Sequence, residues 1–180
     1  MNLKVLIEEV AISFEPILAD RQQTLSLDLH EGPAWLEADR GRLIQVLSNI
    51  VSNASKYSEP GTDINLRWVV DGGDMKLSVV DRRRGMKPED LSRLFTLFFR
   101  APEVELSSTP GTGVGLYMSR KIVEMHGGEI NVDSAYGVGT TVSVCLHGVT
   151  TIGNAEERGQ PRFRNRLNDL PDVEKVVGLG

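Results

Sequence analysis

The chain has 180 residues, of which 40% are hydrophobic, so it can bury one core and we expect one domain with at most a short appendage. Its 20 basic and 25 acidic side chains give a net charge of -5, which argues against nucleic acid as a partner. No apolar run approaches the roughly 20 residues that span a bilayer, the N-terminus lacks a signal-peptide layout and the single cysteine cannot form an internal disulfide, so we expect a reducing, cytoplasmic location.

The N-terminal segment has apolar side chains at helical spacing over residues 3–22 and predicts a helix that Pro16 kinks or restarts. This pattern begins almost at Met1 without a capping residue, so we expect the chain to be part of a longer protein. Alternating apolar residues over 25–29 and a short run over 35–38 then predict extended segments.

A second helix is predicted over residues 40–56, and one of its faces is unusual. Asparagine is a mediocre helix former, yet Asn49 and Asn53 lie at positions i and i+4, one turn before Lys56. A solvated face more often carries Glu and Lys, so the pattern favours a binding site over an ordinary surface. Amide oxygens are neutral hard ligands, which suit a Mg²⁺ ion whose charge is largely compensated by phosphates.

Four further segments alternate apolar and polar residues and predict strands over 63–70, 75–81, 129–134 and 140–147. The first two are joined as a hairpin by the turn at 71–74. The last two have one apolar and one polar face, which predicts a sheet covered on one side only. We therefore expect an α+β fold, a two-layer sandwich in which three helices cover one face of a mixed sheet of about five strands.

Residues 110–128 combine a glycine-rich turn with about three turns of helix. Gly111, Gly113 and Gly115 let bare backbone approach a bulky polar group, and the helix start behind them offers free N–H groups and a positive dipole end. Together they predict an anion site, of the kind that binds phosphate. The turn alone matches neither a P-loop nor a dinucleotide motif, because Leu116 replaces the third glycine, so an ordinary capped turn stays an alternative.

The segment between the second and third of these strands contains several polar features. Asp81 ends a buried strand, where a carboxylate is costly unless a group donates to it. A short helix over 88–94 and an aromatic cluster over 95–99 precede a polar loop at 101–110. This loop is either a lid over a ligand or a plain connector.

The cysteine and the histidines give no sign of a metal site. Cys145, His30, His126 and His147 lack the spacing of structural zinc ligands, so we expect no such site and interpret the cysteine as a small packing residue. His126 lies at a helix C-terminus, where we expect a structural role. Residues 149–180 lose the periodic pattern and are interpreted as a polar linker or tail.

Five short motifs, in this order, closely resemble the N, G1, F, G2 and G3 boxes of the catalytic ATP-binding domain of bacterial sensor histidine kinases. They are the runs Asn49-x3-Asn53-Ala54-x-Lys56-Tyr57, Asp81-x3-Gly85-Met86, Leu94-Phe95-x2-Phe98-Phe99-Arg100, Gly111-Thr112-Gly113-Val114-Gly115-Leu116 and Gly137-x-Gly139-Thr140-Thr141. Five motifs in order are far more specific than any one of them. The resemblance implies the Bergerat sandwich of the GHKL (HATPase_c) proteins over residues 1–148, followed by the tail.

The resemblance also implies roles for the matching residues. Asn53, helped by Asn49, would hold a Mg²⁺ ion that bridges the phosphates of ATP. Lys56 would contact phosphate, Tyr57 would pack beside the nucleotide, and Asp81 would accept the amino hydrogen of adenine. The glycine box would wrap the phosphates, and two threonines would line the adenine end. The remaining residues implied to bind the nucleotide are Gly85, Met86, Gly111, Thr112, Gly113, Val114, Gly115, Leu116, Thr140 and Thr141.

The residue type at position 49 distinguishes kinases from hydrolases among the proteins that this chain resembles. Gyrase-type ATPases and related serine kinases have a glutamate four residues before the metal-binding asparagine, where it deprotonates water or a hydroxyl. An amide cannot take a proton, whereas a neutral imidazole is already a nucleophile, so we expect phosphoryl transfer to histidine. None of the three histidines lies in the family's H-E-x-x-x-P helix. We therefore assign no catalytic residue within this chain.

The implied partners follow from this missing acceptor. They are a dimerisation and histidine phosphoacceptor domain, upstream or on another chain, and a response regulator. The parent kinase would be a homodimer, with or without a membrane anchor, and the isolated domain a monomer.

The G1 box departs from the family pattern D-x-G-x-G, because the chain reads Asp81-Arg82-Arg83-Arg84-Gly85. Arg83 replaces a glycine whose bare backbone lets adenine and an ordered water approach. Two hypotheses follow: either the arginine swings outward and the domain binds ATP, or the domain is a degenerate pseudokinase that serves as an interaction or regulatory scaffold.

Overall fold

The computed structural model describes residues 1–82, 85–102 and 111–151. In chain order, its elements are α1 (Leu3–Asp20), β1 (Thr24–Leu29), β2 (Ala34–Trp35), α2 (Arg40–Tyr57), β3 (Asp63–Asp71), β4 (Asp74–Asp81), α3 (Pro88–Leu91), α5 (Gly115–Met125), β5 (Glu129–Ala135), β6 (Gly139–His147) and β7 (Thr150–Thr151). Within these ranges, no helix combines the length and the apolar character that a membrane span requires.

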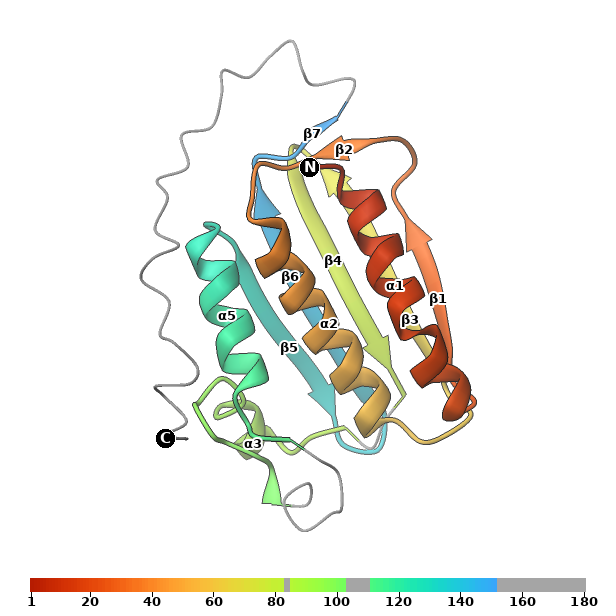
Figure 1. The fold of residues 1–180 in the computed structure, drawn as a ribbon. Coiled ribbons are helices and arrows are strands. Elements are labelled where there is room, and N and C mark those ends of the chain that lie inside the picture. The colour runs from red at the N-terminus through yellow and green to blue at the C-terminus, as the bar shows by residue number, and fades with distance from the viewer. Residues whose placement is uncertain (83–84, 103–110, 152–180) are drawn as a thin grey trace, which may run out of the picture.

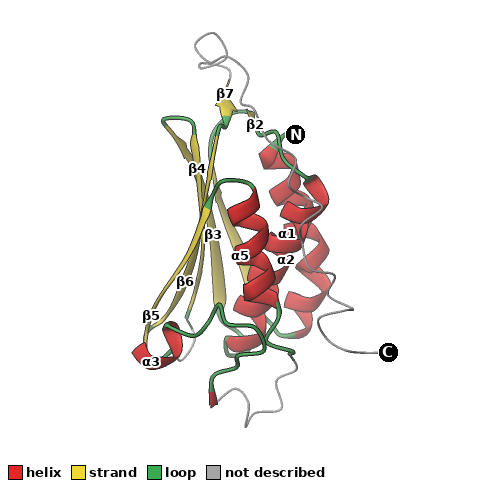
Figure 2. Ribbon diagram, turned by 90° about the vertical axis from the view of Figure 1, so that its left-hand side faces the viewer, coloured by secondary structure: helices red, strands yellow, loops and turns green. Residues whose placement is uncertain are grey.

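One mixed sheet organises the fold. Its strand order is β1-β3-β4-β6-β5, with β1 parallel to β3 and the other neighbours antiparallel. The helices α1, α2 and α5 lie side by side against one face of this sheet (Figure 1), and the side view in Figure 2 shows the two layers. The predicted α+β fold, a two-layer sandwich with a five-stranded sheet and three helices on one face, is confirmed.

The core lies between the sheet and the three helices. Side chains along β3, β4 and β6 alternate between buried and more exposed positions, as the period of two predicts. Trp68 of β3 is 0% exposed at the centre of the core. The outward positions of the same strands carry polar residues such as Lys76 and Ser143, so a single helical layer is enough to bury the apolar face.

Helix α1 differs from the sequence prediction in two respects. Asn2 caps it, because its Oδ1 accepts a hydrogen bond from the backbone N–H of Lys4 at 3.0 Å, so the expectation of an uncapped start was wrong. The helix also runs unbroken through Pro16 to Asp20. Phe14 and Leu18 are buried on either side of the proline, and this packing holds the helix together despite the lost backbone bond.

The packed chain includes residues beyond β6. Val149 is 2% exposed, and its N–H donates to the carbonyl of Gly73 at 2.8 Å. The following strand, β7, pairs antiparallel with β2. The predicted linker or tail began at residue 149, whereas residues 149–151 belong to the packed chain; residues 152–180 lie outside the described residues.

His126 joins the end of α5 to the start of α2. It is 5% exposed, and its Nδ1 lies 2.7 Å from the carbonyl of Ile122 while its Nε2 accepts the N–H of Asp39 at 3.2 Å. These partners require the neutral tautomer with hydrogen on Nδ1. Asp39 in turn caps α2 by accepting the N–H of Arg42 at 2.9 Å. The expected structural role of His126 is thus visible as a link between the C-terminal end of α5 and the N-terminal end of α2.

Replacing this ring tests the link. His126→Ala removes a buried side chain and leaves two backbone groups without their ring partner, so we expect the free energy of unfolding to fall by about 3 kcal/mol in urea denaturation. The control is His30→Ala, because His30 makes an edge contact with Trp68 at a ring-centroid distance of 5.6 Å but is only half-buried. We expect its loss to cost about 1 kcal/mol. Equal losses would contradict the linking role.

Candidate nucleotide-binding site

The polar face of α2 meets α5. Nδ2 of Asn49 donates to Oγ of Ser119, a residue of α5, at 2.9 Å. Asn53 follows one turn later on the same face and is half-buried, whereas Lys56 is exposed near the C-terminal end of the helix. The face that the sequence singles out as a binding surface is therefore the one directed at the neighbouring helix.

The glycine-rich turn before α5 is locked against the F box. Gly113 has φ of +72°, and a Cβ added there would lie 2.6 Å from the carbonyl carbon of Phe98. The N–H of Phe98 donates to the carbonyl of Gly113 at 3.1 Å, and Phe98 itself has φ of 63°. Two segments with strained backbones thus pack directly on each other, and only glycine satisfies both the φ angle and the space.

Gly115 brings the start of α5 against Asn49. A Cβ at Gly115 would lie 2.1 Å from Oδ1 of Asn49, so the absence of a side chain lets the amide pack on the helix backbone. The N-cap residue Val114 makes no side-chain capping bond, so no side chain at this position satisfies the first N–H groups of the helix.

A cavity opens beside this contact. It has a volume of about 320 Å³ and lies between the two helices and the turn. Its lining residues are Gln45, Asn49, Thr112, Val114, Gly115, Met118 and Ser119. The N box and the G2 box therefore share one cavity, as their proposed common ligand requires.

A second polar cluster lies where β4 ends and β6 begins. Asp81 and Thr140 are paired across these strands, and each is 2% exposed. A Cβ at Gly139 would lie 2.3 Å from the carbonyl oxygen of Asp81, so this glycine is required for the close pairing. Thr141 follows on the opposite face of β6, because side chains alternate along a strand, so the structure does not bring it together with Asp81 and Thr140.

Ser134 joins the G1 and G3 boxes and was missed by the sequence analysis. Its Oγ accepts the N–H of Met86 at 2.9 Å, donates to the carbonyl of Gly139 at 2.9 Å and lies 2.8 Å from Oγ1 of Thr140. A hydroxyl has one hydrogen to donate, so Thr140 is the donor in the last contact. The signal was present, because Ser134 is a polar residue at an inward-facing position of β5.

Gly85 fixes the other end of the G1 box. It has φ of +71°, and an added Cβ would lie 2.0 Å from the carbonyl oxygen of Ala135. The box therefore packs backbone to backbone against the turn between β5 and β6. Arg83, the residue that departs from the family pattern, and residues 103–110 of the predicted lid over 101–110 lie outside the described residues.

The remaining predicted residues border the glycine turn. Gly111 lies near Tyr57, because a Cβ on this glycine would be 3.7 Å from Oη of the tyrosine. Gly111 and Thr112 are exposed, and Leu116 in the first turn of α5 is half-buried. Arg120 of α5 places its guanidinium carbon 5.0 Å from the ring centre of Phe95 and so ties the helix to the F box.

These residues fit a nucleotide with a bound Mg²⁺ ion. The glycine turn has the bare backbone and helix N-terminus that suit phosphates, the side chain of Asn53 has the kind of hard neutral oxygen that Mg²⁺ binds, and the carboxylate of Asp81 is of the kind that accepts from an amino group. The two clusters are separate, as the two ends of a nucleotide are. The site thus offers binding groups at both ends, but no carboxylate next to the glycine turn among the residues that line the cavity.

Alanine substitution separates backbone strain from crowding at Gly113. Gly61 has a similar φ of +77° but nothing within 4 Å of an added Cβ, so it is a matched control. We expect Gly61→Ala to lower the free energy of unfolding by about 1 kcal/mol and Gly113→Ala by about 3 kcal/mol, because the second also displaces the backbone of Phe98. Urea denaturation measures both. Equal losses would mean that the backbone of Phe98 can move away from an added Cβ at Gly113 without a further loss of stability.

Comparisons with known proteins agree with this geometry. The family model described as "Histidine kinase-, DNA gyrase B-, and HSP90-like ATPase" matches residues 38–149. The sensor-like histidine kinase SenX3 of Mycolicibacterium smegmatis is 34% identical over 137 residues, which is 76% of this chain and 35% of that protein. The sensor protein SrrB of Staphylococcus aureus is 30% identical over 144 residues, which is 80% of this chain and 24% of that protein. The chain thus spans about a quarter to a third of the length of these relatives.

Solved structures of histidine kinases share the fold. The mycobacterial sensor histidine kinase MprB superposes with a TM-score of 0.69 and 27% identity, over 82% of this chain and 95% of that one. Full-length ShkA in complex with AMPPNP gives a TM-score of 0.72 and 25% identity, over 84% of this chain and 31% of that one. The chain therefore belongs to the histidine kinase-, DNA gyrase B- and HSP90-like ATPase family, as the catalytic ATP-binding domain of a sensor histidine kinase.

Proposed function

We propose that the domain binds Mg-ATP where α2, α5 and the paired ends of β4 and β6 meet, and that the γ-phosphoryl group passes to a histidine of a dimerisation domain outside this chain. The observation that carries the proposal is the cavity of about 320 Å³ in which Asn49 lies against the glycine turn. A response regulator would then receive the phosphoryl group from that histidine.

The phosphate end of the site is assigned to the start of α5. Its first N–H groups have no capping side chain and its turn has no side chain at Gly113 or Gly115, so phosphate oxygens can accept from bare backbone. Since Nδ2 of Asn49 is bonded to Ser119, we assign Asn49 to holding the two helices at this spacing and Asn53 to the Mg²⁺ ion. The exposed ammonium of Lys56 is free to turn toward phosphate.

The adenine end is assigned to Asp81. The carboxylate of Asp81 is 2% exposed at the paired ends of β4 and β6, and a carboxylate oxygen can accept a hydrogen bond from the amino group of adenine. Thr140, held by Ser134, lies across from it. This arrangement supports selection of a base that carries an exocyclic amine. ShkA, a relative of the same fold, was solved with AMPPNP, an adenine nucleotide.

The chemistry is assigned to phosphoryl transfer because none of the described residues that line the cavity is a base. The position that would need to deprotonate water is Asn49, whose amide is too weak a base to accept a proton at neutral pH and already donates to Ser119. A neutral imidazole nucleophile needs no such base. Bound Mg²⁺ would neutralise the charge that develops on the phosphates, while the residues of this chain position the nucleotide and exclude water.

One observation keeps the pseudokinase alternative open. At Gly85, the other glycine of the same box, an added Cβ would lie 2.0 Å from a backbone oxygen, so a side chain at that position would clash. An arginine at position 83 replaces a second glycine of that box. If this side chain occupies the adenine pocket, the domain acts as a scaffold with weak or no nucleotide binding.

Titration with Mg-ATP separates these functions. We expect the wild type to bind in the micromolar to submillimolar range by isothermal calorimetry. Asn53→Ala and Asp81→Asn should each weaken binding about 10-fold or more, since each loses a charge-assisted or metal contact. Asn65→Ala, which removes an exposed asparagine from the open face of β3, is the control and should bind like the wild type.

The variant Arg83→Gly decides between the two hypotheses. Binding by the wild type that changes little in Arg83→Gly supports the kinase domain. Binding by Arg83→Gly alone supports the pseudokinase, because only removal of the arginine then opens the pocket.

The proposed chemistry also predicts slow turnover of ATP to ADP. Because Asn49 cannot activate water, we expect the isolated chain to hydrolyse bound ATP no faster than the Asn53→Ala variant, as measured by phosphate release. It should also incorporate no phosphate of its own. Appreciable hydrolysis by the wild type would favour an ATPase and contradict the transfer mechanism.

A further inference from the structure

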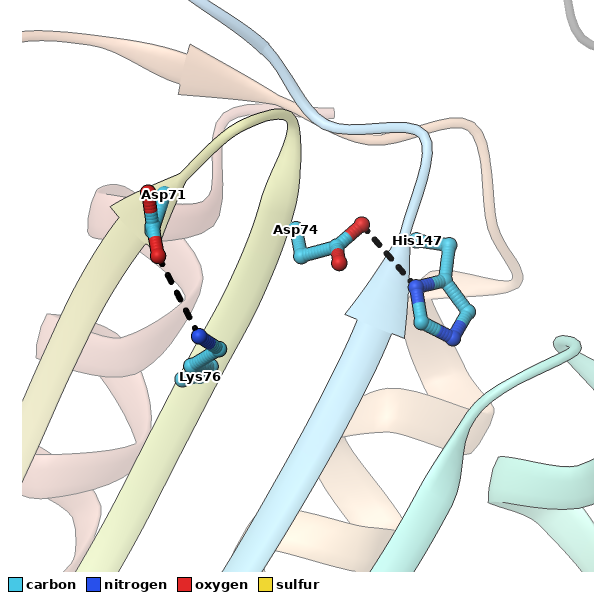
Figure 3. A network of polar contacts seen from close by, with 4 residues as sticks. All are labelled: Asp71, Asp74, Lys76 and His147. Carbon is cyan, nitrogen blue, oxygen red and sulfur yellow. Dashed lines mark hydrogen bonds and ion pairs between the residues drawn. The ribbon is translucent and has the colours of Figure 1, made fainter.

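A cluster of metal-ligating side chains lies on the open face of the sheet, away from the nucleotide site. Asp74, Cys145 and His147 each place a ligand atom within 4.8 Å of the other two. Figure 3 shows the carboxylate of Asp74 directed at the ring of His147, with Oδ1 2.9 Å from Nδ1. A carboxylate, a thiol and an imidazole in one place form a ligand set that none of the ATP-binding chemistry uses.

Strand pairing holds these three residues together. Asp74 is the register partner of His147 in the antiparallel pair of β4 and β6, and Cys145 lies two residues earlier on the same face of β6. The N–H of Val149 donates to the carbonyl of Gly73 at 2.8 Å, which fixes the hairpin turn next to the end of β6. The backbone positions of all three side chains are therefore set by hydrogen bonds rather than by a mobile loop.

The local charges suit a cation. Lys76 is the cross-strand neighbour of Cys145, but its ammonium pairs with Asp71 at 3.2 Å and points away from Asp74 and His147 in Figure 3. Glu129 of β5 is the register partner of Cys145 on its other side. The cluster thus has carboxylates on both flanks, while the nearest lysine is occupied by another carboxylate.

We propose that Asp74, Cys145 and His147 bind a divalent transition metal of borderline softness, Zn²⁺, at this end of the open face. Thiolate, imidazole and carboxylate are the three side chains that zinc takes, in tetrahedral sites with four ligands. Water or the carboxylate of Glu129 completes the set. The metal replaces the hydrogen bond between Asp74 and His147 and links β4 to β6.

The site is independent of the proposed nucleotide site. Asp81 marks the nucleotide end of β4 and Asp74 the opposite end, which puts them about 24 Å apart at roughly 3.4 Å per residue. Asp81 also faces the helices, whereas Asp74 lies on the open face. A metal bound here links β4 to β6, and its binding does not require ATP.

A simple surface ion pair is the competing explanation. An exposed pair of Asp74 and His147 stabilises a protein little, and it gives Cys145 no role. Burial, with the charges of Asp74 and Glu129, raises the pKa of the Cys145 thiol, and a bound cation would reverse this effect of the two carboxylates. The two explanations therefore differ in whether the thiol takes part.

Cobalt and zinc titrations test the participation of the thiol. The full chain, reduced and freed of metal with a chelator, is titrated with Co²⁺, and we expect a thiolate-to-cobalt charge-transfer band together with the visible bands of tetrahedral cobalt. Competition with a chromophoric chelator then gives the affinity for Zn²⁺. Cys145→Ser should abolish the charge-transfer band. The variants Cys145→Ser and His147→Gln should each weaken zinc binding at least about 10-fold.

Matched controls exclude general effects of charge and of other histidines. Asp133→Asn removes an exposed carboxylate of the open face, four residues along β5 from Glu129, and His30→Gln removes a histidine outside the cluster; both should bind zinc like the wild type. Asp74→Asn should bind more weakly. All variants are checked for unchanged circular dichroism, since the three ligands are at most half-buried. A wild type without the thiolate band, or a Cys145→Ser variant with undiminished zinc affinity, overturns the proposal.

Discussion

The close approach of α5 to α2 is the constraint on which the nucleotide site depends. At one end of the pair, Gly115 has no side chain, and this gap lets the amide of Asn49 pack on the helix start and bond to Ser119. At the other end, the buried ring of His126 accepts the first free N–H of α2. A substitution at either end changes the spacing of the helices, and with it the cavity that both of them line.

The glycines of the motifs have a common physical role. Gly85, Gly113 and Gly139 each lie so close to the backbone of another segment that a Cβ would overlap it. The three contacts join loops that are far apart in the sequence, and they leave backbone groups rather than side chains around the site. Ser134 adds the polar link between two of these loops. A site built in this way tolerates substitution of its lining side chains better than it tolerates the addition of a side chain at any of these glycines.

Much of this structure follows from periodicity. The strands, α2 and the inward position of Asp81 were predicted from alternation and helical spacing, because these effects are local along the chain. The cap at Asn2 was missed because a single residue carries that signal. The continuity of α1 through Pro16 was missed because it depends on tertiary packing.

Other features depend on pairing between distant segments. Thr141 was grouped with Thr140 because a motif was transferred as a unit, although neighbouring residues of a strand face opposite ways. The cluster around Cys145 was missed because zinc spacing was sought along the chain, while Asp74 comes from another strand. The sequence identified these residues, but it did not show which face of the sheet Thr141 occupies or which residue lies across the sheet from Cys145 and His147.

The pairing of β2 with β7 brings the first and the last of the described residues close together. The amino group of Met1 donates to the carbonyl of Leu36 at 2.7 Å, and Trp35 pairs with Thr150 across the small sheet. Residues 1 and 151 thus share one corner, at the end of the molecule remote from Asp81 (Figure 1). A rigid domain joined at residue 1 would therefore rotate relative to this domain about that corner. Because the proposed nucleotide site lies at the opposite end of the molecule, a small rotation at the corner would displace the site by a large distance.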